Sequence, residues 1–179
     1  MNLFKKSGSI GDHLDLKKDA TEVSLKENLE KPYKYVHIAG HSFADLENPK
    51  FSGIACYDQK ELTSDSNDGT LYTGEIYNIS SKADLVTLSS FESGYGKLEK
   101  TEGLLGLNRA FIYAGAPNVV FSLWKVYDKV SASMMTDFYG NILEGKSYSA
   151  SLRAAKLKLL EKEETASPHF WSPFLLIGR

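Results

Sequence analysis

Short apolar runs alternate with amphipathic segments along most of this chain, and the alternation restricts the folds open to it. The runs at 35–39, 85–89, 118–122 and 174–177 are four or five residues long and almost wholly apolar, as strands covered on both faces of a sheet require. From 102 to 114, from Asp128 to Gly145 and from Ser147 onward, apolar residues recur at helical spacing. Strands that alternate with amphipathic helices predict an α/β fold with a mostly parallel sheet covered by helices.

The first third of the chain is less regular. Residues 1–20 are polar and glycine-punctuated, so we expect a weakly anchored segment there and one domain over 21–179. We expect a short helix from Thr21 to Leu29, with Asp19 or Thr21 as its N-cap. A second short helix is expected to start at Thr73 and end near Ile79, after a loop that finishes in the turn pair Asp68-Gly69.

Composition excludes several classes of function. A net charge of −2 on 179 residues, without a basic stripe, argues against nucleic-acid binding. The sequence has no run approaching the ~18 apolar residues of a membrane helix, and its first residues lack the apolar core of a signal peptide. The single cysteine, Cys56, permits no internal disulfide. We therefore expect a cytoplasmic protein that binds neither membranes nor nucleic acids.

Two of the apolar runs end in polar residues suited to chemistry. The first run is followed by Gly40 and His41, and the second leads into a small polar loop that contains Phe91. A histidine about 50 residues before a cysteine, both at strand ends, is the spacing of caspase-like proteases. Phe91 stands 50 residues after His41, and a phenyl ring cannot attack a carbonyl. The pattern is that of a protease-like site whose nucleophile is missing.

Other residues near these strand ends are candidates for a substrate cleft. Backbone N–H groups around Gly40 and Ser42 are suited to an oxyanion, and His41 to the role of general base. The turn formed by Glu92, Ser93, Gly94, Tyr95 and Gly96 follows position 91 and is either a cleft wall or an ordinary connection. Beyond the third run, Trp124 either lines the cleft or packs in the core. Asp128 either faces the cleft or serves only as a helix N-cap.

The serines and the cysteine that could replace the missing nucleophile lack the sequence context of a catalytic residue. Ser89, Ser90 and Ser93 lie near position 91, but no Gly-x-Ser-x-Gly elbow surrounds them. Cys56 falls within an apolar strand, where cysteine is usually a small buried hydrophobe. His37 and His41 share the spacing of a metal pair, but a zinc site needs a third ligand, and the His-Glu-x-x-His helix is absent. We expect no metal and no cofactor, and we expect His37 to point into the sheet.

The chain resembles a known family from about residue 18 onward. The residues that carry the resemblance, in order, are the runs His37–Ser42, Ala83–Ser90, Glu102–Leu107, Ala110–Ala116, Ser122–Val126 and Phe170–Gly178. Together they are similar to a CHAT domain, a branch of the caspase-like cysteine peptidase clan.

This resemblance implies a caspase-like three-layer sandwich with a His–Cys dyad. The family's histidine matches His41, and its cysteine matches Phe91, which removes the thiolate that such a peptidase depends on. Around the histidine, Gly40 and Ser42 replace Thr and Gly.

The resemblance also bears on partners and activity. It covers the family's C-terminal, dyad-bearing portion, so it implies either a missing N-terminal half and helical-repeat module or a small stand-alone relative. We expect an inactive domain, either a natural pseudo-peptidase or an active-site variant, that binds a peptide or protein partner, with self-association through an exposed sheet edge. The alternative is an active hydrolase that uses Cys56 or a nearby serine.

Overall fold

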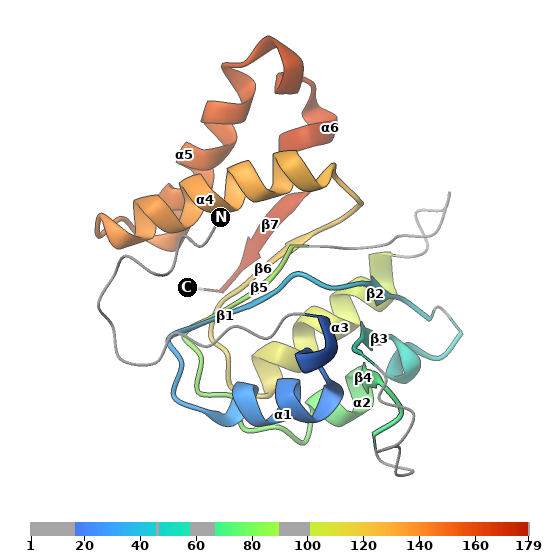
Figure 1. The fold of residues 1–179 in the computed structure, drawn as a ribbon. Helices are drawn as coiled ribbons and strands as arrows, with labels where there is room; N and C mark the ends of the chain where they lie inside the picture. The colour runs from blue at the N-terminus through green and yellow to red at the C-terminus, as the bar shows by residue number, and fades with distance from the viewer. Residues whose placement is uncertain (1–16, 46, 58–66, 90–100, 179) are drawn as a thin grey trace.

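A four-stranded sheet forms the middle layer of the molecule (Figure 1). The structure is a computed structural model and describes residues 17–45, 47–57, 67–89 and 101–178, without the side chains of 101–105. The strand order is β1-β5-β6-β7, in which the first three strands are parallel and β7 is antiparallel to β6. Their bounds are β1 Tyr35–Ile38, β5 Leu85–Leu88, β6 Val119–Ser122 and β7 Phe174–Ile177. The predicted α/β fold with a mostly parallel sheet is confirmed.

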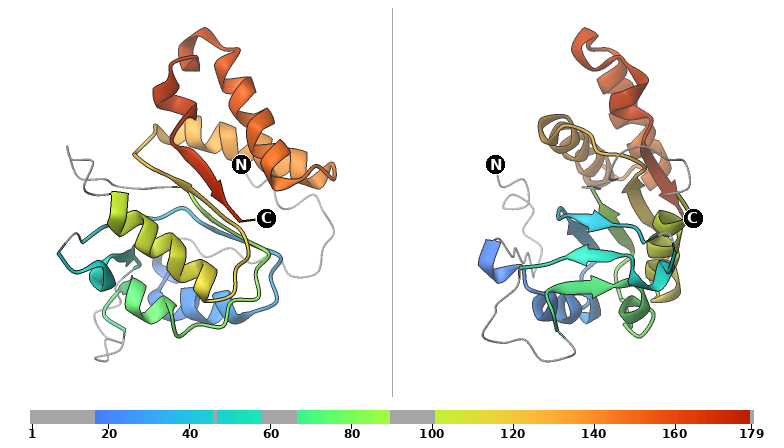
Figure 2. Two further views of the ribbon diagram at one scale, coloured as in Figure 1. Left: turned by 180° about the vertical axis from the view of Figure 1, so that it is seen from behind. Right: turned by 90° about the vertical axis from the view of Figure 1, so that its right-hand side faces the viewer.

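Helices cover both faces of this sheet (Figures 1 and 2). Helices α1, α2 and α3 lie on one side, and α4 and α5 lie on the other. The helix bounds are α1 Glu22–Glu30, α2 Thr73–Ile76, α3 Thr101–Tyr113, α4 Asp128–Leu143, α5 Tyr148–Leu160 and α6 Pro168–Trp171, with 3-10 turns η2 Lys17–Asp19, η3 Pro49–Phe51 and η5 Glu163–Thr165. The expected helices are all present, although α2 ends three residues before Ile79.

The two faces of the main sheet contribute side chains to two separate hydrophobic cores. Val86 and Leu88 of β5 point into the first core, with α1–α3, whereas Leu85 points into the second core, with α4 and α5. This alternation is the period of two that a strand imposes on its side chains. The largest fully buried members are Phe111 and Phe121 in the first core and Phe138 and Phe174 in the second. Each such side chain stabilises the fold by about 2–3 kcal/mol.

Polar residues at the helix ends fix where the helices begin and stop. Thr21 Oγ1 accepts a hydrogen bond from Ser24 N at 3.1 Å, so Thr21 rather than Asp19 is the N-cap of α1. Helix α4 ends at Leu143, and Gly145, two residues later, has a φ of +88° that suits glycine. The expectation that Asp128 is an N-cap is wrong, because Tyr127 occupies that position and Asp128 is the first helical residue. A carboxylate in the first turn still interacts favourably with the helix dipole.

A second, smaller sheet follows directly after β1. It consists of the antiparallel strands β2 Ser42–Phe43, β3 Gly53–Ala55 and β4 Thr70–Tyr72, in the order β2-β3-β4 (Figure 2). Gly53 is required where β3 meets β4, because a Cβ there would lie 2.9 Å from Leu71 O. This sheet was not predicted from the sequence. No helix in the described ranges is long and apolar enough to cross a membrane.

Candidate functional site

The carboxyl ends of β1 and β5 lie side by side. Ile38 pairs with Leu88, and Ser89 N donates a hydrogen bond to Ile38 O at 3.2 Å just beyond that pair. His41 stands three residues after Ile38, as Phe91 stands three after Leu88. Phe91, Glu92, Ser93 and Gly94 fall outside the described residues, as does Ser90. The closeness of His41 and Phe91 therefore stays a prediction, which the pairing of their strands favours.

His41 lies in the short connection between the two sheets. Its side chain is exposed, and its carbonyl accepts a hydrogen bond of 2.8 Å from Ala55 N in β3. The next residue, Ser42, is buried in β2 opposite Ile54. Gly40 has no positive φ, and a Cβ there would meet Ala55 O at an ordinary 3.7 Å. The small sheet thus anchors the backbone at His41 and Ser42, while the imidazole remains exposed.

His37 occupies a different environment, on the face of β1 that is turned toward α4. Its Nε2 shares a hydrogen bond of 2.7 Å with Ser89 Oγ, and its ring stacks on Tyr139 at 5.6 Å between centroids. Tyr139 in turn donates a hydrogen bond of 2.8 Å to Thr87 Oγ1 in β5. Burial lowers the pKa of His37 to about 4. The imidazole is therefore neutral near pH 7 and points into the sheet, as expected.

The contact between His37 and Ser89 was not predicted from the sequence. The sequence presents Ser89 as a candidate replacement nucleophile, and His37 as a possible metal ligand that more plainly points into the sheet. The signal that could have indicated this contact is the position of each residue relative to the end of its strand. Parallel pairing sets His37 opposite Thr87, which brings Ser89, two residues after Thr87, within reach of the imidazole. Among the described residues, no group of three or more His, Cys, Asp or Glu could hold a metal ion.

Cys56 lies directly after β3, partly buried against the first core. Its Sγ is 3.7 Å from Ile54 O in a weak hydrogen bond. Burial raises the pKa of the Cys56 thiol to about 11. Reactive cysteines have the opposite property, a lowered pKa that keeps the thiolate populated. This environment is that of a structural cysteine.

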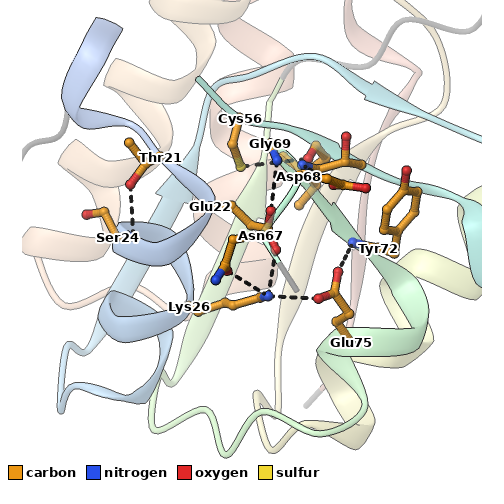
Figure 3. Close-up of polar contacts among 12 residues, drawn as sticks. Thr21, Glu22, Ser24, Lys26, Cys56, Asn67, Asp68, Gly69, Tyr72 and Glu75 are labelled. Carbon is orange, nitrogen blue, oxygen red and sulfur yellow. Dashed lines mark hydrogen bonds and ion pairs between the residues drawn. The ribbon is translucent and has the colours of Figure 1, made fainter. Parts of the chain in front are cut away.

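A group of charged residues near Cys56 connects α1 to α2 (Figure 3). Lys26 Nζ lies 2.5 Å from Glu22 Oε1 and 2.7 Å from Glu75 Oε1. Glu22 Oε2 also accepts a hydrogen bond from Gly69 N at 3.0 Å, and Glu75 Oε2 accepts one from Tyr72 N at 3.0 Å. We call Glu22, Lys26 and Glu75 the charged clamp. It fixes the start of the domain to the small sheet.

Trp124 follows the end of β6 and packs against α6. Its Nε1 donates a hydrogen bond of 3.0 Å to His169 O, and the two rings stack at 6.1 Å. Ser122 Oγ donates a hydrogen bond of 2.5 Å to Trp124 O, which fixes the start of this connection. The indole is partly exposed and Asp128 is exposed. These contacts establish that Trp124 packs, and its role as a cleft wall stays a prediction.

Comparison with known proteins agrees with this architecture. The sequence matches the CHAT domain family over residues 1–179. It is 33% identical over 108 residues to tetratricopeptide repeat protein 28 of Mus musculus and 32% identical over 108 residues to the Homo sapiens protein of that name. Each match covers 60% of this chain but only 4% of the relative. The full-length match to the family leads to one conclusion: this chain belongs to the CHAT domain family, whose members are related to caspase-like peptidases.

Proposed function

We propose that this domain binds a peptide or protein partner at the carboxyl ends of β1 and β5 and does not carry out cysteine-dependent hydrolysis. One observation supports the proposal most strongly. The only thiol in the sequence, Cys56, is partly buried, and its pKa is raised to about 11. With Phe91 at the family's nucleophile position, no other residue supplies a thiolate.

The binding function uses the remaining parts of a peptidase site. In this proposal His41 contributes an accessible imidazole, and the backbone near Gly40 and Ser42 provides N–H donors to the bound chain. Glu92, Ser93 and Gly94 form one wall, with Trp124 and Asp128 contributing another. Because the relatives are named as tetratricopeptide repeat proteins, we propose that a repeat module is the natural regulatory partner of this domain.

A matched pair of glycine substitutions tests peptide binding. Gly40 and Gly140 both leave ordinary or open space for a Cβ, but only Gly40 adjoins the proposed site. We expect affinity selection from a random peptide library to yield binders that Gly40→Phe loses and Gly140→Phe retains. If selection yields no binders, or if both variants bind equally well, the proposed site is wrong.

A peptide carrying a thiol-reactive group tests the absence of cysteine chemistry. We expect no labelling of the chain at Cys56, whereas Phe91→Cys introduces a thiol that His41 can activate. Labelling of Cys56 in the unsubstituted protein would support the active-hydrolase alternative.

A serine hydrolase is the second candidate, because Ser89 and His37 share a hydrogen bond of 2.7 Å. A hydroxyl beside a neutral imidazole is the first requirement of a nucleophile–base pair. However, no carboxylate in the described ranges bonds to the imidazole, and the ring is stacked against Tyr139. A fluorophosphonate probe separates the candidates: the binding domain stays unlabelled, and a hydrolase is labelled at Ser89.

Self-association is a further part of the proposal. Strands β1 and β7 stand at the two edges of the main sheet, and an edge strand with free backbone groups favours pairing with another chain. Light scattering over a dilution series should detect a concentration-dependent mass. A constant monomer mass, with a melting temperature independent of concentration, would exclude it. The cytoplasmic location stays a prediction.

A further inference from the structure

We infer that His37 and Ser89 form a positioning pair that sets the spacing between the strand end leading to His41 and the strand end leading to position 91. This inference rests on the proposed function, since it concerns how the same site is built. His37 is thereby assigned a role distinct from that of His41, although the two histidines stand only four residues apart.

The first support is location. Ser89 is the first residue after β5, and it is tied to β1 twice, by its N–H to Ile38 O at 3.2 Å and by its Oγ to His37 Nε2 at 2.7 Å. The backbone bond continues the parallel ladder, whereas the side-chain bond adds a cross-link that the ladder does not provide. Beyond these two bonds, β1 leads into the small sheet and β5 into the segment that contains position 91.

The second support is the way the imidazole itself is held. Tyr139 of α4 stacks on it with an interplanar angle of 29°, and the Tyr139 hydroxyl is fixed by Thr87 of β5. Thr87 is also the residue that pairs with His37 across the strands. Side chains from β1, β5 and α4 thus hold one another in place. The His37 ring is therefore preorganised and needs little reordering to bond to Ser89 Oγ.

The third support is protonation. Burial lowers the pKa of His37 to about 4, so its ring stays uncharged and one nitrogen accepts the Ser89 proton when the other carries the imidazole proton. A neutral hydrogen-bonding ring suits a fixed contact. Exposed His41 is left as the group that faces a ligand.

The test uses Phe91→Cys as a chemical reporter of spacing. A histidine close to the introduced thiol lowers its pKa, and iodoacetamide alkylation across pH 5–9 measures that pKa. We expect Ser89→Ala in this background to move the alkylation midpoint upward and to slow alkylation at pH 6.5 by about ten-fold, on the scale of one pKa unit. Ser89→Thr keeps the hydroxyl and should restore the midpoint.

Two controls complete the design. Ser151→Ala removes a buried hydroxyl on α5 that makes no hydrogen bond in the described part of the chain, and it should leave the midpoint unchanged. His41→Ala should abolish the lowered pKa. The ¹⁵N shifts of His37 provide a second readout. In the unsubstituted chain they should report a neutral ring, and Ser89→Ala should change the populations of its two tautomers. His37→Gln serves as the second variant if Ser89→Ala does not fold.

The outcomes distinguish the inference from the function on which it rests. An alkylation midpoint that depends on His41 but is equally unaffected by Ser89→Ala and Ser151→Ala overturns the positioning role and leaves the site intact. A thiol with no dependence on His41 means that the two strand ends do not form the dyad arrangement, and both ideas then fail.

Discussion

Two polar clusters connect distant parts of this chain, and they differ in charge. The charged clamp joins α1 to α2 through Lys26 and two carboxylates, whereas the positioning pair joins β1 to β5 through two neutral groups. Burial lowers the pKa of Lys26, but its contacts with Glu22 and Glu75 raise it more, so the pKa lies above the ordinary value. Burial alone lowers the pKa of His37. The clamp therefore stabilises a charge and the pair excludes one.

Acid should have the largest effect, and it should act at the positioning pair. His37 has a pKa of about 4 in the folded protein against 6.5 for the unfolded group, so the unfolded state binds more protons between these values. Its contribution to stability is complete above pH 6.5 and is lost as the pH falls toward 4, by about 3 kcal/mol. Urea unfolding at several pH values measures this loss. His37→Gln should flatten the profile by that amount, and an unchanged slope would refute the assignment.

Removal of the cation should break the charged clamp. Lys26→Ala leaves the Glu22 side chain, which is 3% exposed, with a buried carboxylate and no cationic partner. We expect a loss of about 2 to 3 kcal/mol in the free energy of unfolding. This is at the low end of the losses seen when a buried ion pair is broken, because Lys26 is partly exposed. Lys158→Ala breaks the exposed contact with Asp137 and should change stability little. Equal losses from both variants would contradict the difference in burial.

Tyr139→Phe should weaken the contacts that hold the His37 ring in place, while keeping the aromatic ring that stacks on it. It removes the hydroxyl that donates to Thr87 Oγ1, and Thr87 is fully buried. We expect a loss of about 1 to 2 kcal/mol. Thr87→Val combined with Tyr139→Phe should recover part of this loss, since both polar groups are then absent. Additive losses in the double mutant would show that the two hydroxyls do not interact.

Replacement of the buried amide of Asn108 should stabilise the protein, in contrast to the losses expected above. Asn108 on α3 is fully buried, and neither amide atom has a hydrogen-bond partner in the described ranges. Asn108→Leu replaces an unpaired amide by an apolar side chain of similar size, and we expect a gain of roughly 1 kcal/mol. Thermal melts of the two proteins provide the measurement. A destabilised variant would imply that the amide has a partner outside the described residues.

Much of the fold could be predicted from the sequence, because local patterns specify it. The four apolar runs became the four strands of the main sheet, and Thr21 and Ser147 act as N-caps. The direction of β7 could not be predicted, since an apolar run reads the same in either orientation. The small sheet was missed because β2 is only two residues long and takes its stability from pairing rather than from its own pattern.

The site was less predictable than the fold, for a physical reason. His41 and Cys56 could be selected from residue type and position, but the pKa of Cys56 depends on burial, which a lone motif does not report. The contact between His37 and Ser89 spans 52 residues and arises from strand register. Register is decided by how two whole strands pair, so a residue-by-residue reading does not yield it.

The reversed direction of β7 has a practical consequence for handling the protein. Phe174 starts beside Ser122, at the carboxyl end of β6, and Ile177 finishes beside Val119, at the amino end. The strand therefore leads the chain away from the carboxyl ends of β1 and β5, where His41 follows. A fluorophore or surface linker coupled at Gly178 would lie at the opposite end of the strands, so a domain immobilised in that orientation would present its candidate site to the surrounding solution.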